Sequence, residues 1–236
     1  AVPVVTWSNP VAITYGTALS GTQLNASASV NGTFNYKPVS GEVLGAGNQT
    51  LSAVFTPSDV VNYSTVNKSV ALTVSKATPT INVAPTALGI TYGKALSNAT
   101  LSGGNASVAG TFAYASPKTV PSEGTTSQTV IFTPSNGANY TTVSANVSVT
   151  VGKATPTIKV VPTALGIKYG QTLSNATLSG GSASVAGTFA FTSPEMVPDV
   201  GGATQSVAFT PTDSANYNTV SANVSVTVSK AVPVVT

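Results

Sequence analysis

The stretch Phe55-Thr56-Pro57-Ser58-Asp59-Val60-Val61-Asn62-Tyr63 occurs three times in this chain of 236 residues, with small changes. It returns as Phe132–Tyr140 and as Phe209–Tyr217, so that its final tyrosine recurs every 77 residues. A fixed period of this length is typical of tandem arrays of small modules. The period predicts three repeats, residues 1–76, 77–153 and 154–230.

The composition narrows the class of protein. Charged residues make up only 6% of the chain, against roughly 25% in an ordinary soluble protein. The surface must therefore consist mainly of Ser, Thr, Asn and Gly, which suits an extracellular stalk. The net charge is +3, and the nine basic residues are all lysines scattered along the chain. Because nucleic-acid readers cluster Arg and Lys, we expect no nucleic-acid partner.

Several kinds of chemistry are disfavoured by residues that the sequence lacks. There is no Cys and no His, which removes disulfides, thiol chemistry, the usual zinc sites and the commonest general base. No nucleophile and base pair can be proposed. We therefore expect no enzymatic activity, no cofactor and no metal, and no run of apolar residues predicts insertion into a membrane.

Alternating apolar residues predict an all-β fold. In Thr50–Phe55 the residues Leu51, Ala53 and Phe55 share one face, and in Ser69–Val74 the residues Val70, Leu72 and Val74 do so. Such alternation is typical of half-buried antiparallel strands. Further strands are predicted at Val2–Trp7, Ile13–Gly16 and Gly32–Pro38, and at the matching positions of the other repeats. No segment has a 3.6-residue period.

The repeated stretch itself is predicted to be a corner between the last two strands of each repeat. Asp59, Asn136 and Asp213 occupy its equivalent acidic or amide position. These side chains are expected to cap backbone N–H groups in an Asx-turn; the alternative is a calcium ligand, for which one carboxylate per corner is too few. The tyrosines of the corners, Tyr63, Tyr140 and Tyr217, are expected to pack in the core or to hydrogen-bond back to the chain.

The segments between repeats are short. Only Ser75–Pro79 and Gly152–Pro156 separate the last strand of one repeat from the first strand of the next. Each contains a proline, which fixes φ, and flexible linkers are longer and richer in Gly and Ser. We therefore expect a semi-rigid, extended rod.

The two ends of the chain carry the same hexapeptide. Residues 231–236, Ala-Val-Pro-Val-Val-Thr, are identical to residues 1–6, whereas the middle and third repeats open with Ala-Thr-Pro-Thr-Ile. Residues 231–236 are thus expected to begin a further repeat like the first. Two interpretations follow: one unit of a longer array, or the repeating unit of a filament whose segment 231–236 adds a strand to a neighbouring copy.

The repeats resemble the bacterial Ig-like and MBG (YGX-type) tandem repeats of large, adhesin-like surface proteins. The resemblance covers all three repeats and rests on Tyr15-Gly16, Tyr92-Gly93 and Tyr169-Gly170, the Gly-Thr-Phe strands, and the Phe-Thr-Pro corner. It implies a cell-surface or secreted protein whose repeats project a distal domain or pack together. It leaves open an Ig-like β-sandwich or a β-grasp-like sheet; the many strands and the absence of a clear helix favour the sandwich.

Asn-x-Ser/Thr motifs are frequent and are candidate acceptors for N-linked glycans. Those at predicted turns and corners are Asn25, Asn48, Asn62, Asn98, Asn139 and Asn175. The alternative is that these asparagines only shape turns.

Three functions fit the sequence. The first is a stalk or fibre component of an extracellular surface protein. The second is the repeating unit of an extracellular filament joined by strand addition. The third is an adhesin module that binds glycans or other surface proteins. The expected partners are neighbouring copies of the repeat and, for the third function, those ligands.

Overall fold

The computed structural model describes residues 1–232. It confirms the predicted all-β class: the described residues form strands and turns, and their only helical residues are two 3-10 turns, η1 (Leu96–Asn98) and η2 (Leu173–Asn175). Most of the segment predicted to begin a further repeat, residues 233–236, lies outside the described residues.

The strands recur in the three sequence repeats. Those of the first are β1 (Val5–Thr6), β2 (Ile13–Thr14), β3 (Ser27–Ala28), β4 (Gly32–Lys37), β5 (Gly47–Pro57) and β6 (Val66–Ser75). Those of the middle repeat are β7 (Ile81–Val83), β8 (Thr86–Ala87), β9 (Ile90–Thr91), β10 (Leu101–Ser102), β11 (Asn105–Ala106), β12 (Gly110–Tyr114), β13 (Gly124–Pro134) and β14 (Val143–Gly152). Those of the third are β15 (Ile158–Val160), β16 (Thr163–Ala164), β17 (Ile167–Lys168), β18 (Leu178–Ser179), β19 (Ser182–Ala183), β20 (Gly187–Phe191), β21 (Gly201–Pro211) and β22 (Val220–Ser229).

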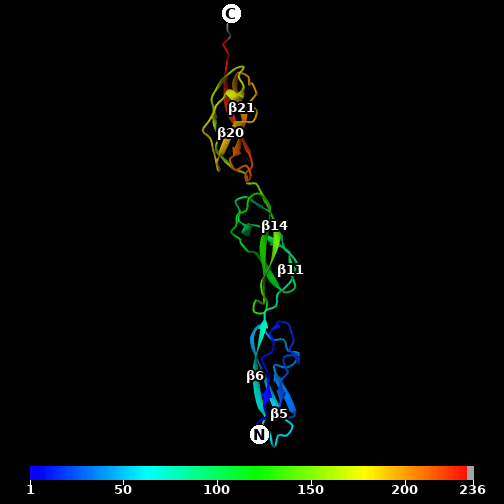
Figure 1. Cartoon of the computed structure of the whole chain (residues 1–236). Helices are drawn as coiled ribbons and strands as arrows, with labels where there is room; N and C mark the ends of the chain where they lie inside the picture. Colours follow the sequence, from blue (N-terminus) through cyan, green and yellow to red (C-terminus); the bar gives the residue numbers. More distant parts are fainter. Residues whose placement is uncertain (233–236) are drawn as a thin grey trace. The chain divides into compact units, whose positions relative to one another are not determined.

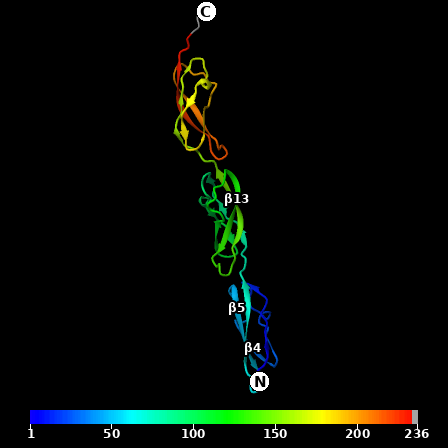
Figure 2. The same cartoon turned by 60° about the vertical axis from the view of Figure 1, so that its left-hand side comes forward.

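Each repeat has one four-stranded sheet. Its strand order is β2-β6-β5-β4 in the first repeat, β9-β14-β13-β12 in the middle one and β17-β22-β21-β20 in the third. Figure 1 shows β5 and β6 side by side near the N-terminus, and Figure 2 shows β4 next to β5. Three strands in this antiparallel order match one sheet of an Ig-like sandwich, and the small β1–β3 pair lies outside that sheet. The β-grasp alternative requires an α-helix on the sheet, and residues 1–232 contain none.

One pairing differs from the predicted antiparallel arrangement. The short edge strand β2 runs parallel to β6, with Ile13 opposite Val74, and β17 pairs with β22 in the same way. Parallel neighbours need a long crossover between them. The chain supplies it because β3, β4 and β5 all lie between β2 and β6 in sequence.

The inward faces predicted from the alternation are confirmed in the first repeat. Leu51, Ala53 and Phe55 of β5 and Val70, Leu72 and Val74 of β6 are all buried. Trp7, for which either core or junction packing was open, lies in this core, and its Nε1–H donates to the carbonyl of Gln23 at 3.0 Å. The third repeat has an equivalent core around Val207, Val224, Val226 and Val228.

The chain divides into two compact units. One comprises residues 1–86, 101–115 and 129–147, and the other residues 87–100, 116–128 and 148 onward. Each unit therefore holds one terminal repeat together with part of the middle repeat. Because the units do not coincide with the sequence repeats, the boundaries at 76/77 and 153/154 stay a prediction.

Tyr114 presents an unusual polar group inside the middle repeat. Its hydroxyl is the only buried side-chain polar atom within residues 1–232 that has no hydrogen-bond partner, and burial raises the pKa of this phenol. At the matching position of the first repeat, the Tyr36 hydroxyl accepts a hydrogen bond from the Ala26 N–H at 3.0 Å. The third repeat has Phe191 there, which lacks the hydroxyl.

We expect Tyr114→Phe to raise the free energy of unfolding by about 1 kcal/mol, because it removes a buried oxygen that makes no bond. Urea denaturation measures the change. The matched substitution Tyr36→Phe removes a satisfied hydroxyl and should lower stability by about 1 kcal/mol. Equal losses in both variants would contradict the prediction.

Candidate functional site

The corner between β5 and β6 is built by Asp59. Its Oδ1 accepts hydrogen bonds from the Val61 N–H at 3.2 Å and the Asn62 N–H at 3.1 Å, and its Oδ2 accepts one from Asn62 Nδ2 at 2.8 Å. The side-chain and backbone bonds from Asn62 lower the pKa of the Asp59 carboxyl. This is the geometry of an Asx-turn.

The depressed pKa makes the corner sensitive to acid. Because these hydrogen bonds favour the carboxylate, their stabilisation is present above the ordinary carboxyl pKa of 3.8 and is lost as the pH falls through the folded-state value. A carboxyl-detected NMR titration should place the midpoint of Asp59 below 3.8. Asn62→Ala should raise it, whereas Asn67→Ala, on exposed β6, should leave it unchanged. An unshifted midpoint in Asn62→Ala would refute this assignment.

The other two corners are variants of the same turn. Asn136 Oδ1 accepts a hydrogen bond from the Asn139 N–H at 3.3 Å. Asp213 Oδ1 accepts one from the Asn216 N–H at 3.2 Å, and Asn216 Nδ2 donates to Asp213 Oδ2 at 3.0 Å. Within residues 1–232, no three Asp, Glu, His or Cys side chains gather as a metal site would require. The geometry thus offers no support for the calcium alternative.

In the first unit, the second corner contacts the end of the first repeat. The ring of Tyr140 packs edge-on against Tyr15, with centroids 5.3 Å apart and planes at 81°. Asn139 Oδ1 accepts a hydrogen bond from the Ala46 N–H at 2.8 Å. Lys76 Nζ donates to the carbonyl oxygen of Gly137 in the same corner. An aromatic pair, an amide hydrogen bond and a lysine contact therefore join the two repeats.

The backbone adds a second layer to this junction. The Ala77 N–H donates to the Asn139 carbonyl at 2.9 Å, and the Thr141 N–H donates to the Ala77 carbonyl at 2.9 Å. Ala77 forms an isolated parallel bridge with Tyr140. The first residue of the middle repeat is thereby fixed to that repeat's own corner, directly beside Lys76.

The second unit contains the same junction 77 residues further along. Tyr217 packs edge-on against Tyr92, with centroids 5.4 Å apart and planes at 84°. Asn216 Oδ1 accepts a hydrogen bond from the Glu123 N–H at 2.8 Å, and Lys153 Nζ donates to the Ser214 carbonyl at 2.7 Å. The contacts match those of the first unit group for group.

The sequence predicted the corners as turns inside each repeat and did not predict that they contact the preceding repeat. A signal was present, because the Tyr-Gly pairs at Tyr15, Tyr92 and Tyr169 recur at the same interval as the Asn-Tyr pairs. Burial separates the roles of the corners: Asn139 and Asn216 are half-buried. The equivalent Asn62 is exposed, and so is Tyr169 at 52%.

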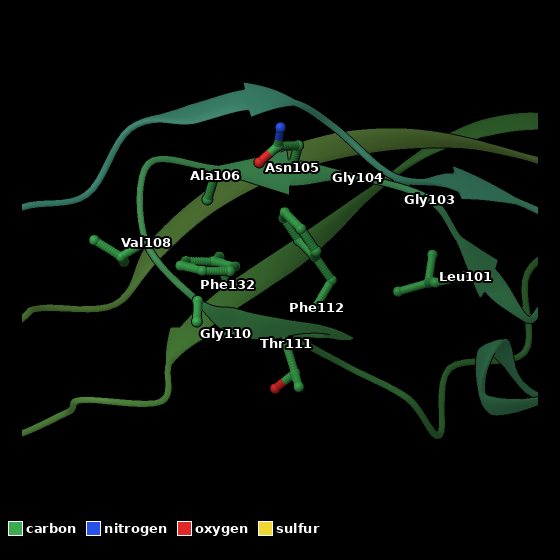
Figure 3. Close-up of a pocket in the computed structure, with 11 residues that line it drawn as sticks. Leu101, Gly103, Gly104, Asn105, Ala106, Val108, Gly110, Thr111, Phe112 and Phe132 are labelled. Atoms are coloured by element: carbon green, nitrogen blue, oxygen red, sulfur yellow. The ribbon is translucent and has the colours of Figure 1, made fainter.

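A pocket of about 440 Å³ lies in the middle repeat. Figure 3 shows the rings of Phe112 and Phe132 pointing toward the Gly103–Ala106 segment, while Thr111 points away. A Cβ at Gly104, where φ is +86°, would come within 2.8 Å of the Phe112 ring, so only glycine fits there. A matching pocket of about 450 Å³ surrounds Phe189 in the third repeat. No charged side chain lines either pocket, so their chemistry is that of apolar rings and backbone.

The candidate glycan acceptors differ in accessibility. Five side chains are exposed, namely Asn25, Asn48, Asn62, Asn98 and Asn175. The sixth, Asn139, is half-buried, and its Oδ1 is bonded to Ala46. Glycosylation at the first five stays a prediction, whereas the side chain of Asn139 is engaged in the junction.

Comparisons with known proteins give structural likeness only. No protein-family model and no curated protein matches the chain. Sidekick-1 immunoglobulin domains 1–5 align over 97% of this chain and 59% of their own, at 12% identity and a TM-score of 0.35. Titin I-band fragment I67–I69 aligns over 96% and 98%, at 9% identity and 0.36, and Drosophila N-cadherin EC1-3 over 96% and 100%, at 13% and 0.30. These TM-scores are too low to support conclusions about function. Within residues 1–232, no helix has the length and hydropathy to span a bilayer.

Proposed function

We propose that this chain is a structural repeat region of an extracellular surface protein and acts as a semi-rigid stalk or fibre component. The observation that carries the proposal is the junction contact made by Asn139 and Tyr140 in the first unit and by Asn216 and Tyr217 in the second. A repeat that contacts its neighbour through the same groups each time has a defined rise and twist per repeat. Such an array serves as a spacer.

The magnitudes agree with a semi-rigid junction. An edge-on aromatic pair contributes about 0.5–1.5 kcal/mol beyond area burial, and a neutral hydrogen bond about 1 kcal/mol. These terms act on linkers of only a few residues, in which Pro79 and Pro156 are buried. Little slack is left for the repeats to reorient. The low charge content, 6%, gives a polar surface suited to the outside of a cell.

The test compares two equivalent asparagines. Asn216 and Asn62 both donate to the aspartate of their own corner, but only Asn216 also accepts from a preceding repeat, at the Glu123 N–H. We expect Asn216→Ala to broaden the distribution of distances between spin labels at Lys118 and Lys159, two exposed positions. Asn62→Ala should leave that distribution unchanged.

Pulsed electron–electron resonance measures both distributions, and the absence of native cysteine allows clean labelling. A broad distribution in the unsubstituted chain would refute the semi-rigid spacer. The same width for both variants would show that the asparagine contact does not hold the junction.

A second candidate function is polymerisation. We infer it from the identity of residues 231–236 with residues 1–6, which allows the end of one copy to supply the opening strand of another. Sedimentation velocity at rising concentration tests it: growing oligomers are expected, and a monomer throughout would refute it.

A further inference from the structure

The third repeat carries every group that the first two repeats use to receive a corner. The receiving groups are Tyr15, the Ala46 N–H and Lys76 in the first unit, and Tyr92, the Glu123 N–H and Lys153 in the second. Continuing by 77 residues gives Tyr169, Val200 and Lys230. Tyr169 is 52% exposed and Val200 46%, whereas Tyr15 and Tyr92 are half-buried under their partner tyrosines. Tyr169 and Val200 therefore form an open receiving face beside Lys230.

The first repeat carries the complementary corner. Asn62 Nδ2 donates to Asp59, just as Asn216 Nδ2 donates to Asp213. This bond fixes the amide so that its Oδ1 is oriented as that of Asn216 is toward Glu123. Asn62 is exposed where Asn216 is half-buried. The first corner thus has the same internal geometry as a docked corner.

We propose that the Tyr169–Val200–Lys230 face of one copy binds the Asn62–Tyr63 corner of a second copy, and that residues 231–236 of the first replace residues 1–6 of the second. This rests on the second proposed function and names its surface. Tyr63 would pack on Tyr169, Asn62 Oδ1 would accept from the Val200 N–H, and Lys230 would donate to the Val60 carbonyl. Because the two contacting surfaces differ, the assembly is head-to-tail.

The exchange of the opening strand follows from the backbone at the corner. Ala1 donates to the Asn62 carbonyl, and its own carbonyl accepts from the Ser64 N–H at 3.0 Å. Ala77 and Ala154 occupy the same place in their repeats, each directly after the junction lysine. A complete junction between copies therefore needs Ala231 where Ala1 lies. Since the two hexapeptides are identical, the exchange changes no side chain in the receiving repeat.

Engineered cysteines test the contact, because the chain has none of its own. Full-length Asn62→Cys is mixed with full-length Val200→Cys at high concentration under oxidising conditions. We expect a disulfide-linked dimer of the two variants, which the exposed control Lys159→Cys does not form with Asn62→Cys. Ala46→Cys combined with Asn139→Cys in one chain is the positive control, because these residues are hydrogen-bonded at 2.8 Å.

Two additions separate the proposed mode from chance collision. Tyr169→Ala in the Val200→Cys chain should abolish the disulfide-linked dimer, and Tyr169→Phe should preserve it. Excess peptide Ala-Val-Pro-Val-Val-Thr should also suppress the dimer by competing for the strand position. A dimer yield equal to that of the Lys159→Cys control, or one unaffected by Tyr169→Ala or by the peptide, would overturn the inference. If sedimentation shows oligomers without this disulfide, the surface is wrong but polymerisation stands; a monomer in sedimentation refutes both.

Discussion

Replacing Gly187 with alanine is expected to lower the free energy of unfolding by about 3 kcal/mol, at the upper end of the usual cost of overpacking a core. Gly187 begins β20 and lies opposite Pro211 of β21. A Cβ at this position would lie 2.5 Å from Phe209 Cζ and 2.5 Å from the Thr210 carbonyl oxygen. Phe209 is buried at 2% exposure, so its ring has no space to move away.

The matched control is Gly202→Ala in β21 of the same repeat. An added Cβ there meets no atom within 4 Å, and the position is exposed. Removing a glycine where the backbone needs none stabilises by about 0.4–1 kcal/mol through the unfolded chain. Urea denaturation of both variants gives the comparison. A loss in Gly187→Ala no larger than in Gly202→Ala would mean that the close approach at the start of β20 does not constrain the sequence.

The same close approach explains why Gly-Thr-Phe recurs. At Gly32 the added Cβ would lie 2.5 Å from Phe55 Cζ, and at Gly110 2.4 Å from Phe132 Cζ. Each glycine allows the strand to pass beside the phenylalanine of the corner stretch. The sequence motif is thus a packing requirement of each repeat, and it indicates no ligand.

The long strands could be predicted from the sequence because their apolar residues alternate over enough positions to fix an inward face. Leu51, Ala53 and Phe55 do so in β5. The ends of β5 could not be predicted as well, because Gly47, Asn48 and Gln49 are not apolar although they pair with β6. The ladders of only two residues, such as β16 with β18, are too short to show any period.

The junction could not be predicted for a different reason. In a tandem array, a residue that contacts its own repeat and one that contacts the preceding repeat recur at the same interval. The period of Tyr63, Tyr140 and Tyr217 therefore does not distinguish the two cases. Only the fold shows that Tyr140 reaches Tyr15 and that Tyr217 reaches Tyr92.

Coupling between Tyr15 and Tyr140 is the second large effect that we expect. Tyr140→Ala should destabilise the first unit by about 2 kcal/mol, because it removes both the edge-on pair and the half-buried surface of the ring. Tyr63→Ala is the matched control: this tyrosine ends the equivalent corner, and it pairs with no aromatic ring within residues 1–232. Tyr63→Ala should cost less than Tyr140→Ala.

A double-mutant cycle isolates the contact from general losses of packing. Tyr15→Ala, Tyr140→Ala and the double variant, compared by urea denaturation, should give an interaction energy of about 0.5–1.5 kcal/mol. Additive losses would mean that the rings touch without stabilising each other, and the stiffness of the junction would then rest on Asn139 and the short linker. A measurable coupling instead makes each repeat more stable beside its neighbour than alone, which is the property that a load-bearing array of small domains requires.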